Sequence, residues 1–156
     1  MPELFPVGYD EEIVTREDIT DGKKTGYREG VYFDPETMDF VRDGQHRVKS
    51  ATGIESWEQW CRNCLMTERG AYPSYGDTFG IKTKEAFEAE TRGLAQSILT
   101  REICESLQND PYGRTKYVRI VEFAWIGADA ASIDVQIVGI DDATIDITTV
   151  LDIRKR

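Results

Sequence analysis

Histidine and cysteine, which supply many metal ligands and catalytic groups, are scarce in this chain. It has one histidine, His46, and three cysteines. A serine hydrolase needs a base beside its nucleophile, and this chain has neither a second histidine nor a Gly-x-Ser-x-Gly motif. Cys61 and Cys64 have the spacing of half a zinc site, but no further Cys or His pair completes four ligands. We therefore expect two buried thiols one helical turn apart, and no metal or other cofactor.

An excess of positive charge and long hydrophobic runs are also lacking. The chain has 19 Lys and Arg residues against 29 Asp and Glu residues, which gives a net charge of −10. A nucleic-acid-binding surface needs basic side chains that neutralise phosphates, so this class is disfavoured. No apolar run approaches the roughly 20 residues that cross a bilayer, and residues 1–6 show no secretory signal. We expect a protein of a cytoplasm-like compartment that has no disulfide framework and binds neither nucleic acid nor membrane.

Phosphate-binding and calcium-binding loops are missing as well, because neither a Gly-Lys-Ser/Thr ending nor an Asp-x-Asp-x-Asp-Gly pattern occurs. Glycoside hydrolysis needs only two carboxylates about 5–9.5 Å apart, so Glu68 and Asp77 remain an open pair. With 29 acidic residues, however, some pair always looks suitable. We predict that the protein is not an enzyme, and a small peptidoglycan-active enzyme is the alternative.

The chain does contain enough hydrophobic residues, 40% of 156, for a sizeable core in about one domain. Residues 1–30 are predicted to form an extended acidic arm, residues 31–153 a single domain, and residues 154–156 a basic tail. At the start of this domain, short apolar runs flank the turn-prone residues 34–37 and precede a second turn at Asp43-Gly44. This pattern predicts a small β-ribbon.

Two helical segments follow. Thr52 and Glu55 form a Ser/Thr-x-x-Glu capping box, and Gly70 is the predicted stop of the helix that they begin. The apolar stripe of this helix contains Ile54, Trp57, Cys61, Cys64 and Leu65. The second segment, residues 84–107, is compatible with a break near residues 91–93 and ends at Asp110-Pro111. Its predicted inner face contains Leu94, Ile98, Leu99, Ile103 and Leu107.

The loop between the helical segments, residues 67–82, combines three glycines, one proline and three aromatic residues. This composition is typical of a folded loop that its own aromatic side chains hold in place. Tyr72 and Tyr75 are expected to fix the loop between the helices. Arg69 is expected to hold it through carbonyl or carboxylate hydrogen bonds, and the alternative is a direct contact of Arg69 with another subunit.

The C-terminal third is predicted to be β-structure. Residues 116–126 are apolar on both faces, which predicts a central strand covered on both sides. The next two strands alternate apolar and polar residues, which predicts a half-buried hairpin with a free outer edge, built on Ile133, Val135, Ile137, Ile145, Ile147 and Leu151. Six aspartates and no Lys or Arg lie in residues 128–152; they can mask this edge or form a solvated face. The predicted fold class is α+β: two main helices packed on a small antiparallel sheet, with an N-terminal β-ribbon and a C-terminal β-hairpin.

These features occur in an order that resembles one protein family. The order is a turn, a glycine before the first helix, a tryptophan pair, an arginine turn and an aromatic loop: Asp43-Gly44, Gly53-Ile54-Glu55, Trp57 and Trp60, Thr67-Glu68-Arg69-Gly70, and Tyr72-Pro73-Ser74-Tyr75-Gly76. Over residues 31–151 the chain is similar to the baseplate wedge proteins, or sheath initiators, of contractile phage tails and phage tail-like particles. It resembles their Gram-positive branch, and some relatives carry the label lysozyme-like. Asp110 and Pro111 match the family's acidic-Pro-Arg tripeptide, but Tyr112 replaces the arginine.

The resemblance implies a structural protein that is present in several copies in the baseplate of a virion, a bacteriocin or another injection particle. Its implied partners are the sheath protein, the baseplate wedge proteins and the tube or tube-initiator protein. We expect it in the host bacterial cytoplasm during assembly, and an adaptor that never enters the particle is a second alternative. The hairpin edge is expected to accept a sheath strand by β-augmentation, with its aspartates selecting a basic partner. The residues expected at interfaces are Arg69, Tyr72, Tyr75, Asp110, Arg114, Asp134, Val135, Ile137, Ile145, Asp146 and Ile147.

Overall fold

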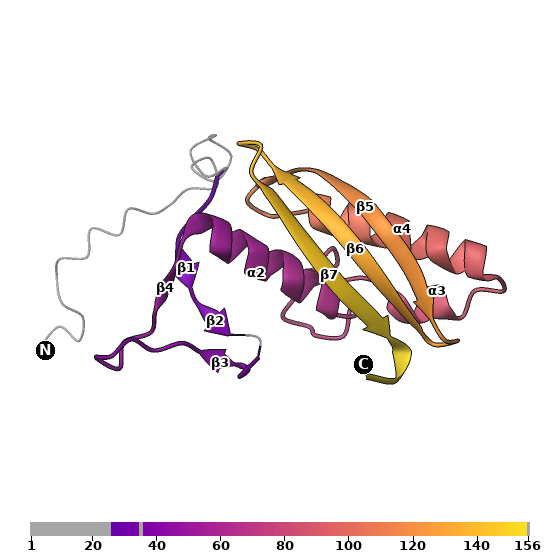
Figure 1. Ribbon diagram of the computed structural model, residues 1–156, viewed down its shortest axis with the longest axis horizontal. Coiled ribbons are helices and arrows are strands. Elements are labelled where there is room, and N and C mark those ends of the chain that lie inside the picture. Colours follow the sequence, from indigo (N-terminus) through magenta and orange to yellow (C-terminus); the bar gives the residue numbers. More distant parts are fainter. Residues whose placement is uncertain (1–25, 35, 156) are drawn as a thin grey trace, which may run out of the picture.

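The computed structural model describes residues 26–34 and 36–155, so residues 1–25 of the predicted arm lie outside it. Four two-residue strands come first: β1 (Gly30–Val31), β2 (Phe33–Asp34), β3 (Asp39–Phe40) and β4 (Ser50–Ala51). Three helices follow: α2 (Gly53–Met66), α3 (Thr83–Phe87) and α4 (Arg92–Gln108). The chain continues with β5 (Thr115–Ile126), β6 (Ala130–Gly139), β7 (Thr144–Asp152) and a short 3₁₀ helix, η2 (Ile153–Lys155). The structure confirms the α+β class (Figure 1).

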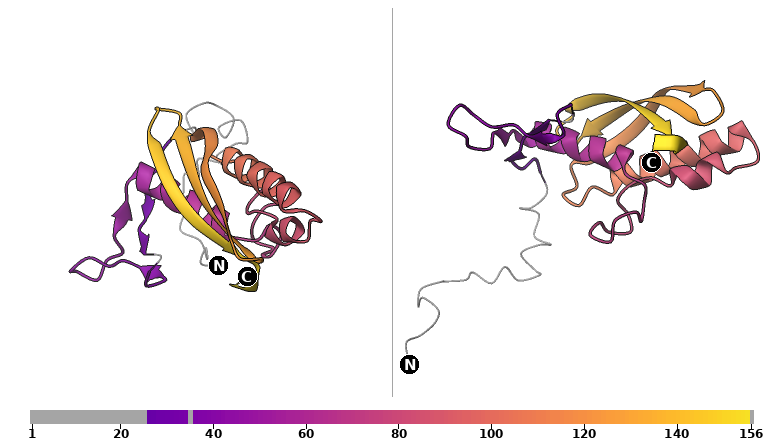
Figure 2. Two further views of the ribbon diagram at one scale, coloured as in Figure 1. Left: turned by 45° about the vertical axis from the view of Figure 1, so that its right-hand side comes forward. Right: turned by 90° about the horizontal axis from the view of Figure 1, so that it is seen from below.

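The main body has two layers. One is an antiparallel sheet in the order β5-β6-β7, and the other contains α2 and α4, which cover one face of that sheet (Figures 1 and 2). The buried core lies between the layers and includes Trp57, Cys61, Leu65, Leu99, Ile103, Leu107, Ile133, Val135, Ile137 and Leu151. The predicted hairpin is therefore present as β6 and β7, with its alternating apolar residues toward the helices.

The prediction that residues 116–126 form a central strand was wrong, because β6 is central and β5 lies at an edge. A β-bulge explains the misleading pattern. The pairing with β6 shifts register between Ile120 and Glu122, so Val118 and Ile120 pack on the core before the shift, and Phe123 and Trp125 pack on it afterwards. The bulge thus places apolar residues from even-numbered and odd-numbered positions on the same face of the sheet.

The capping box of α2 is confirmed. The Thr52 hydroxyl accepts a hydrogen bond from the Glu55 backbone N–H, and the Glu55 carboxylate accepts one from the Thr52 N–H at 2.8 Å. Trp57, Cys61, Cys64 and Leu65 are buried as predicted, but Ile54 is exposed. The first turn of α2 lies against the ribbon, where a side chain at Gly30 would collide with Ser56.

The helix ends differ slightly from the prediction. α2 ends at Met66 rather than near Gly70, because Thr67 already adopts an extended backbone. The predicted break in the second segment is confirmed, since α3 ends at Phe87 and α4 begins after the N-cap residue Thr91. Because α4 begins after Thr91, Ala95 rather than Leu94 faces the core. The prediction that Leu94 lies on the inner face was therefore wrong, since Leu94 is exposed.

The β-ribbon is confirmed as two short antiparallel pairs, β1 with β4 and β2 with β3. The rings of Phe33 and Phe40 meet edge to face across the second pair, with centroids 5.5 Å apart. The predicted turn at Asp43 is formed by its carboxylate, which accepts hydrogen bonds from the N–H groups of Gln45 and Arg47. The ribbon extends sideways from the start of α2, away from the two-layered body (Figures 1 and 2).

Candidate functional site

The free edge of β7 is the most regular strand edge in the described part of the chain. Its pairing with β6 runs without a register shift from Thr144 to Asp152. Gly139 donates to the Ala143 carbonyl at 2.8 Å, and hydrogen-bonded pairs alternate in an antiparallel ladder. The N–H groups of Asp146, Thr148 and Val150 therefore point away from β6. No described strand lies beyond them.

A groove of about 470 Å³ follows this edge, and we call it the β7 groove. Its floor is the outer face of α2, and its two walls are β7 and the ribbon. The lining residues are Tyr32, Phe33, Glu36, Glu55, Glu58, Gln59, Arg62, Asn63, Leu65, Met66, Ile147, Thr148 and Thr149. Sequence reasoning missed this groove, although polar residues recurring on one face of α2, at positions 55, 58, 59, 62 and 63, were a signal for it.

Polar groups connect the parts of the β7 groove. The Gln59 amide oxygen accepts a hydrogen bond from the Phe33 N–H at 3.3 Å, which ties the ribbon to α2. The Gln59 Nε2 is buried and has no hydrogen-bond partner among the described residues. Arg62 forms an ion pair with Glu58 at 2.7 Å, one helical turn earlier.

The hairpin residues predicted at an interface fall into two groups. The side chains of Val135, Ile137, Ile145 and Ile147 are buried in the core, so these residues can reach a partner only through the strand backbone. Asp134 and Asp146 belong to the opposite alternation and lie on the face away from the helices. There the Asp146 carboxylate accepts a hydrogen bond from Gln136, whose amide oxygen accepts one from Arg119.

Several aspartates of the hairpin contact the chain itself rather than forming a freely solvated row. Asp129 pairs with Arg154, and Asp142 pairs with Lys116 at 2.8 Å. Asp141 accepts a hydrogen bond from the Tyr27 hydroxyl at 2.5 Å, and this bond lowers the pKa of Asp141. The tyrosine ring also packs on Trp57, with centroids 5.3 Å apart. Tyr27, which was assigned to the arm, thus fastens the chain to the turn between β6 and β7.

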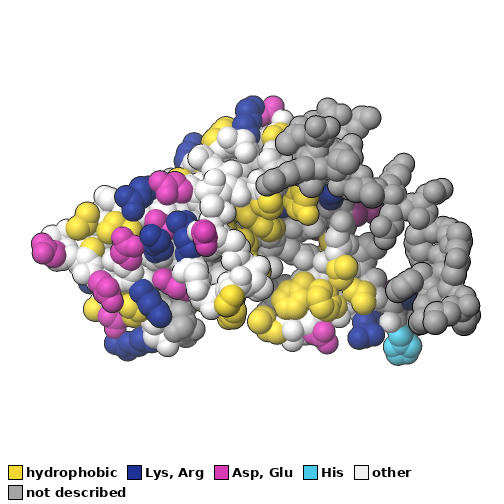
Figure 3. Space-filling model, turned by 180° about the vertical axis from the view of Figure 1, so that it is seen from behind, with side chains coloured by type: hydrophobic (Ala, Val, Ile, Leu, Met, Phe, Trp, Pro, Cys, Tyr) yellow, Lys and Arg dark blue, Asp and Glu magenta, His cyan; other side chains and the backbone are white. Residues whose placement is uncertain are grey.

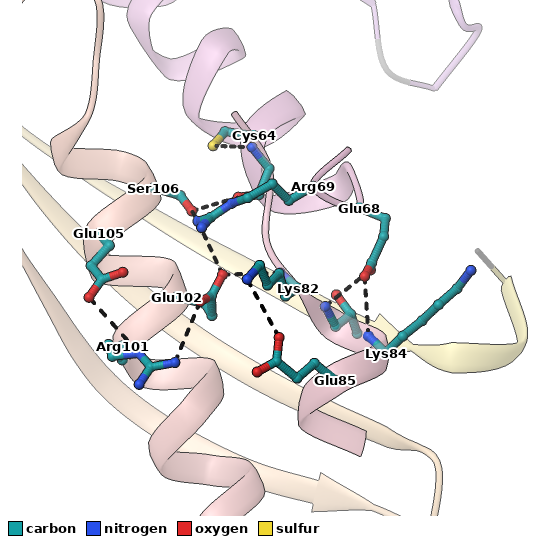
Figure 4. A network of polar contacts seen from close by, with 12 residues as sticks. Cys64, Glu68, Arg69, Lys82, Lys84, Glu85, Arg101, Glu102, Glu105 and Ser106 are labelled. Atoms are coloured by element: carbon teal, nitrogen blue, oxygen red, sulfur yellow. Dashed lines mark hydrogen bonds and ion pairs between the residues drawn. The ribbon is translucent and has the colours of Figure 1, made fainter. Parts of the chain in front are cut away.

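Arg69 holds the loop of residues 67–82 through contacts with carbonyl and carboxylate groups, as predicted. Its guanidinium donates to the Gly80 carbonyl at 3.1 Å and to the Ser106 hydroxyl at 2.6 Å, and it lies 3.1 Å from the Glu102 carboxylate (Figure 4). Both acceptor side chains come from α4, so the arginine joins the loop to that helix. It is mostly buried, which leaves little of its charge for a partner.

Glu68 has a capping role that its sequence neighbours did not reveal. Its carboxylate accepts hydrogen bonds from the backbone N–H groups of Thr83 and Lys84, at the start of α3 (Figure 4). The chain closes the loop at Gly80, which has a φ of +91°. A Cβ there would lie 2.7 Å from the Thr67 carbonyl oxygen, so glycine is required.

Tyr72 and Tyr75, which were expected to fix the loop between the helices, lie largely at the surface. Tyr72 is 58% exposed and Tyr75 is 48% exposed. Their rings contact each other, Tyr75 contacts Phe79, and Phe79 contacts Trp60, with centroid distances of 5.7, 4.5 and 5.9 Å. Beside this row lies a hollow of about 380 Å³, the aromatic hollow, which is lined by Trp60, Asn63, Ser74, Tyr75, Gly76, Thr78, Phe79, Asn109 and Pro111.

Asp110, which lies between the hollow residues Asn109 and Pro111, forms a buried ion pair with Arg114. Two guanidinium nitrogens each lie 2.7 Å from a different carboxylate oxygen, and the Arg114 backbone N–H donates to the same carboxylate. The guanidinium also lies over the rings of Trp60 and Tyr112. Both charged side chains are almost fully buried, so they cannot contact a partner directly. They can affect one only by holding the turn at Pro111 in place.

The described residues contain no group of three His, Cys, Asp or Glu side chains that could hold a metal ion. Burial raises the pKa of the Cys61 thiol and raises that of Cys64 to about 11, which keeps both thiols protonated near neutral pH. None of the helices in residues 26–34 and 36–155 is long and apolar enough to cross a membrane.

Comparison with known families identifies a matching family model. The model of the contractile injection system sheath initiator family matches residues 31–142, which span the ribbon, the three helices, β5 and β6. No curated protein matches the chain. Members of this family are structural components of the baseplates of contractile tails. The matched region covers most of the chain and agrees with the resemblance in its motifs, so this protein belongs to the contractile injection system sheath initiator family.

Proposed function

We propose that this protein starts the sheath at the baseplate by accepting a sheath strand along the free edge of β7. The observation that carries the proposal is the regular edge of β7 beside a groove. An added strand would pair with the outward N–H and C=O groups of β7 and lie over α2. Main-chain hydrogen bonds would supply affinity, and the groove would supply selectivity.

The aromatic hollow is the surface that we assign to the baseplate wedge and the tube. Tyr72, Tyr75 and Tyr112 are all substantially exposed, and exposed aromatic clusters are enriched at protein interfaces. Helix α2 separates the two surfaces, and Asn63 borders both of them. One rigid helix would thus connect the wedge contact to the sheath contact, in each of several copies around the baseplate.

The direct test blocks the edge of β7 without disturbing its pairing to β6. Thr148→Pro removes one outward N–H group, whereas Thr148→Val keeps it and serves as the matched control. In a complemented deletion strain, electron microscopy is expected to show sheathless tubes for the proline variant and sheathed particles for the valine variant. Circular dichroism of each purified variant checks that it folds. Sheathed, contractile particles built from a folded Thr148→Pro protein would refute the proposal.

The wedge contact has a separate test. Because Tyr75 is half exposed, Tyr75→Ala is expected to cost little stability, within about 1 kcal/mol, but to reduce the number of complete baseplates. Tyr117→Ala, at a tyrosine of β5 that is equally exposed and lies outside the hollow, is the matched control, and it is expected to leave baseplate number unchanged. Mass spectrometry of purified particles distinguishes this role from an adaptor that never enters the particle. A turbidity assay on cell walls tests the enzyme alternative, for which we expect no turnover because Glu68 caps α3.

A further inference from the structure

The ribbon stands across the β7 groove from β7 and has no described partner on its outer side. Four of its apolar side chains, Val31, Met38, Phe40 and Val48, are at least 44% exposed. Seen from behind, hydrophobic side chains gather toward the end of the molecule marked by the single histidine, whereas charged side chains dominate the opposite end (Figure 3). Ala51 is the buried apolar residue of the ribbon, and no ribbon residue belongs to the core cluster between the two layers, so the position of β2 and β3 calls for another explanation.

Backbone and side-chain contacts hold the ribbon at a set position over the groove. Tyr32 donates to the Lys49 carbonyl, and Val41 donates to the Tyr32 carbonyl, which keeps the two halves of the ribbon together. The bond from Phe33 to Gln59 attaches it to α2. The ribbon is therefore a wall of the groove, with Tyr32, Phe33 and Glu36 on its inner side.

The lining of the β7 groove is acidic. It contains three carboxylates, from Glu36, Glu55 and Glu58, and one guanidinium, from Arg62, which already pairs with Glu58. Glu55 stays ionised, because its hydrogen bonds to Thr52 lower its pKa. The Glu36 side chain pairs with no residue that the structure describes. A groove with this excess of negative charge favours a basic occupant.

The dimensions fit an extended chain. The groove runs along Ile147–Thr149 of β7, which corresponds to about 10 Å at 3.3 Å per residue. A strand that pairs there would pass over Gln59, whose buried Nε2 lacks an acceptor. A buried donor without a partner costs free energy, and a main-chain carbonyl of the occupant would satisfy it.

We propose that the β7 groove is a clamp for a basic strand, in which the occupant pairs with β7 while its lysine or arginine side chains meet Glu36 and Glu55 and the ribbon covers its outer edge. This inference rests on the proposed function, because it specifies the strand that β7 accepts. In this clamp, side chains of the ribbon and α2 select the strand, and β7 provides the backbone hydrogen bonds.

Two synthetic eight-residue peptides test the clamp, one alternating valine and lysine and the other alternating valine and glutamate. Titration calorimetry with the full chain is expected to show binding of the lysine peptide, and binding of the glutamate peptide at least about tenfold weaker. Glu36→Lys is expected to weaken the binding of the lysine peptide about fivefold. Glu29→Lys changes the net charge equally but lies outside the groove, so it is the matched control. Equal binding of both peptides, no binding of the lysine peptide, or equal effects of the two variants would overturn the clamp.

The fraction of sheathed tubes in purified particles distinguishes this inference from the proposed function. Glu36→Lys is expected to lower the fraction of sheathed tubes and Glu29→Lys to leave it unchanged. Normal sheaths with Glu36→Lys but none with Thr148→Pro would overturn the clamp while the pairing at β7 stands. Normal sheaths with both Glu36→Lys and Thr148→Pro would overturn both.

Discussion

The two edges of the sheet differ in a way that bears on function. β5 has twelve residues and two register shifts, and α4 packs against it. β7 has nine residues in continuous register and a groove beside it. Bulges bend an edge strand and discourage further pairing, so β5 is protected by its own geometry. β7 has no such protection, and a regular edge of this kind is suited to accept another strand.

The largest expected difference between the edges is in hydrogen exchange on assembly. In particles, amide exchange in residues 144–152 should slow by more than about tenfold relative to the free protein, because the outward N–H groups gain partners. Amide exchange in residues 115–126 should be the same in particles as in the free protein. Mass spectrometry of deuterated, quenched particles measures both segments in one sample. Equal protection of both edges would contradict the distinction.

The second difference concerns stability. Trp125 of β5 packs on Phe87 and Phe123, and Arg92 lies over its ring. Trp125→Ala is expected to lower the free energy of unfolding by about 2–3 kcal/mol, less than a fully buried tryptophan would lose. Urea denaturation measures this loss. At temperatures where the variant is folded, it should still build sheathed particles, because β5 serves the core; sheathless tubes would show that its edge also takes part in assembly.

A smaller effect is expected where Tyr27 secures the turn that leads into β7. Burial and the bond to Asp141 raise the pKa of Tyr27, so the stability it contributes is present below its unfolded pKa of about 10 and decreases as the pH rises above it. Asp141 has a lowered pKa, so its contribution is present above its ordinary value and is lost as the pH falls through the folded-state pKa. Tyr27→Phe should lower the melting temperature at pH 7 and flatten this pH dependence. Scanning calorimetry at pH 3, 7 and 10.5 tests both expectations, and an unchanged profile would contradict them.

The smallest effect is expected from charge on the open face of the sheet. Asp146→Asn should change stability by less than about 0.5 kcal/mol, because Asp146 is exposed and asparagine can still accept from Gln136. It should slow sheath attachment and weaken its dependence on salt. Timed assembly at two ionic strengths measures this. If the variant assembles like the wild type, the aspartate is a solvated side chain without a role in selecting the partner.

Features that depend on neighbours in the chain were predictable from the sequence. The capping box of α2, the break before α4 and the ribbon turn at Asp43 all follow from contacts within four residues. The alternation in β6 and β7 is equally local, because successive strand side chains point to opposite faces. The family motifs lie in the same segments, so the family could be inferred before the structure.

Tertiary structure alone decided how these elements meet. The bulge after Ile120 made β5 an edge strand, although its composition indicated a central one. The packing of α4 against the loop buried Arg69 and left Tyr72 and Tyr75 exposed. The β7 groove unites residues from the ribbon, α2 and β7 that are more than 100 positions apart. Local sequence determines the conformation of each segment, whereas exposure and grooves depend on contacts between distant segments, which no periodicity within one segment records.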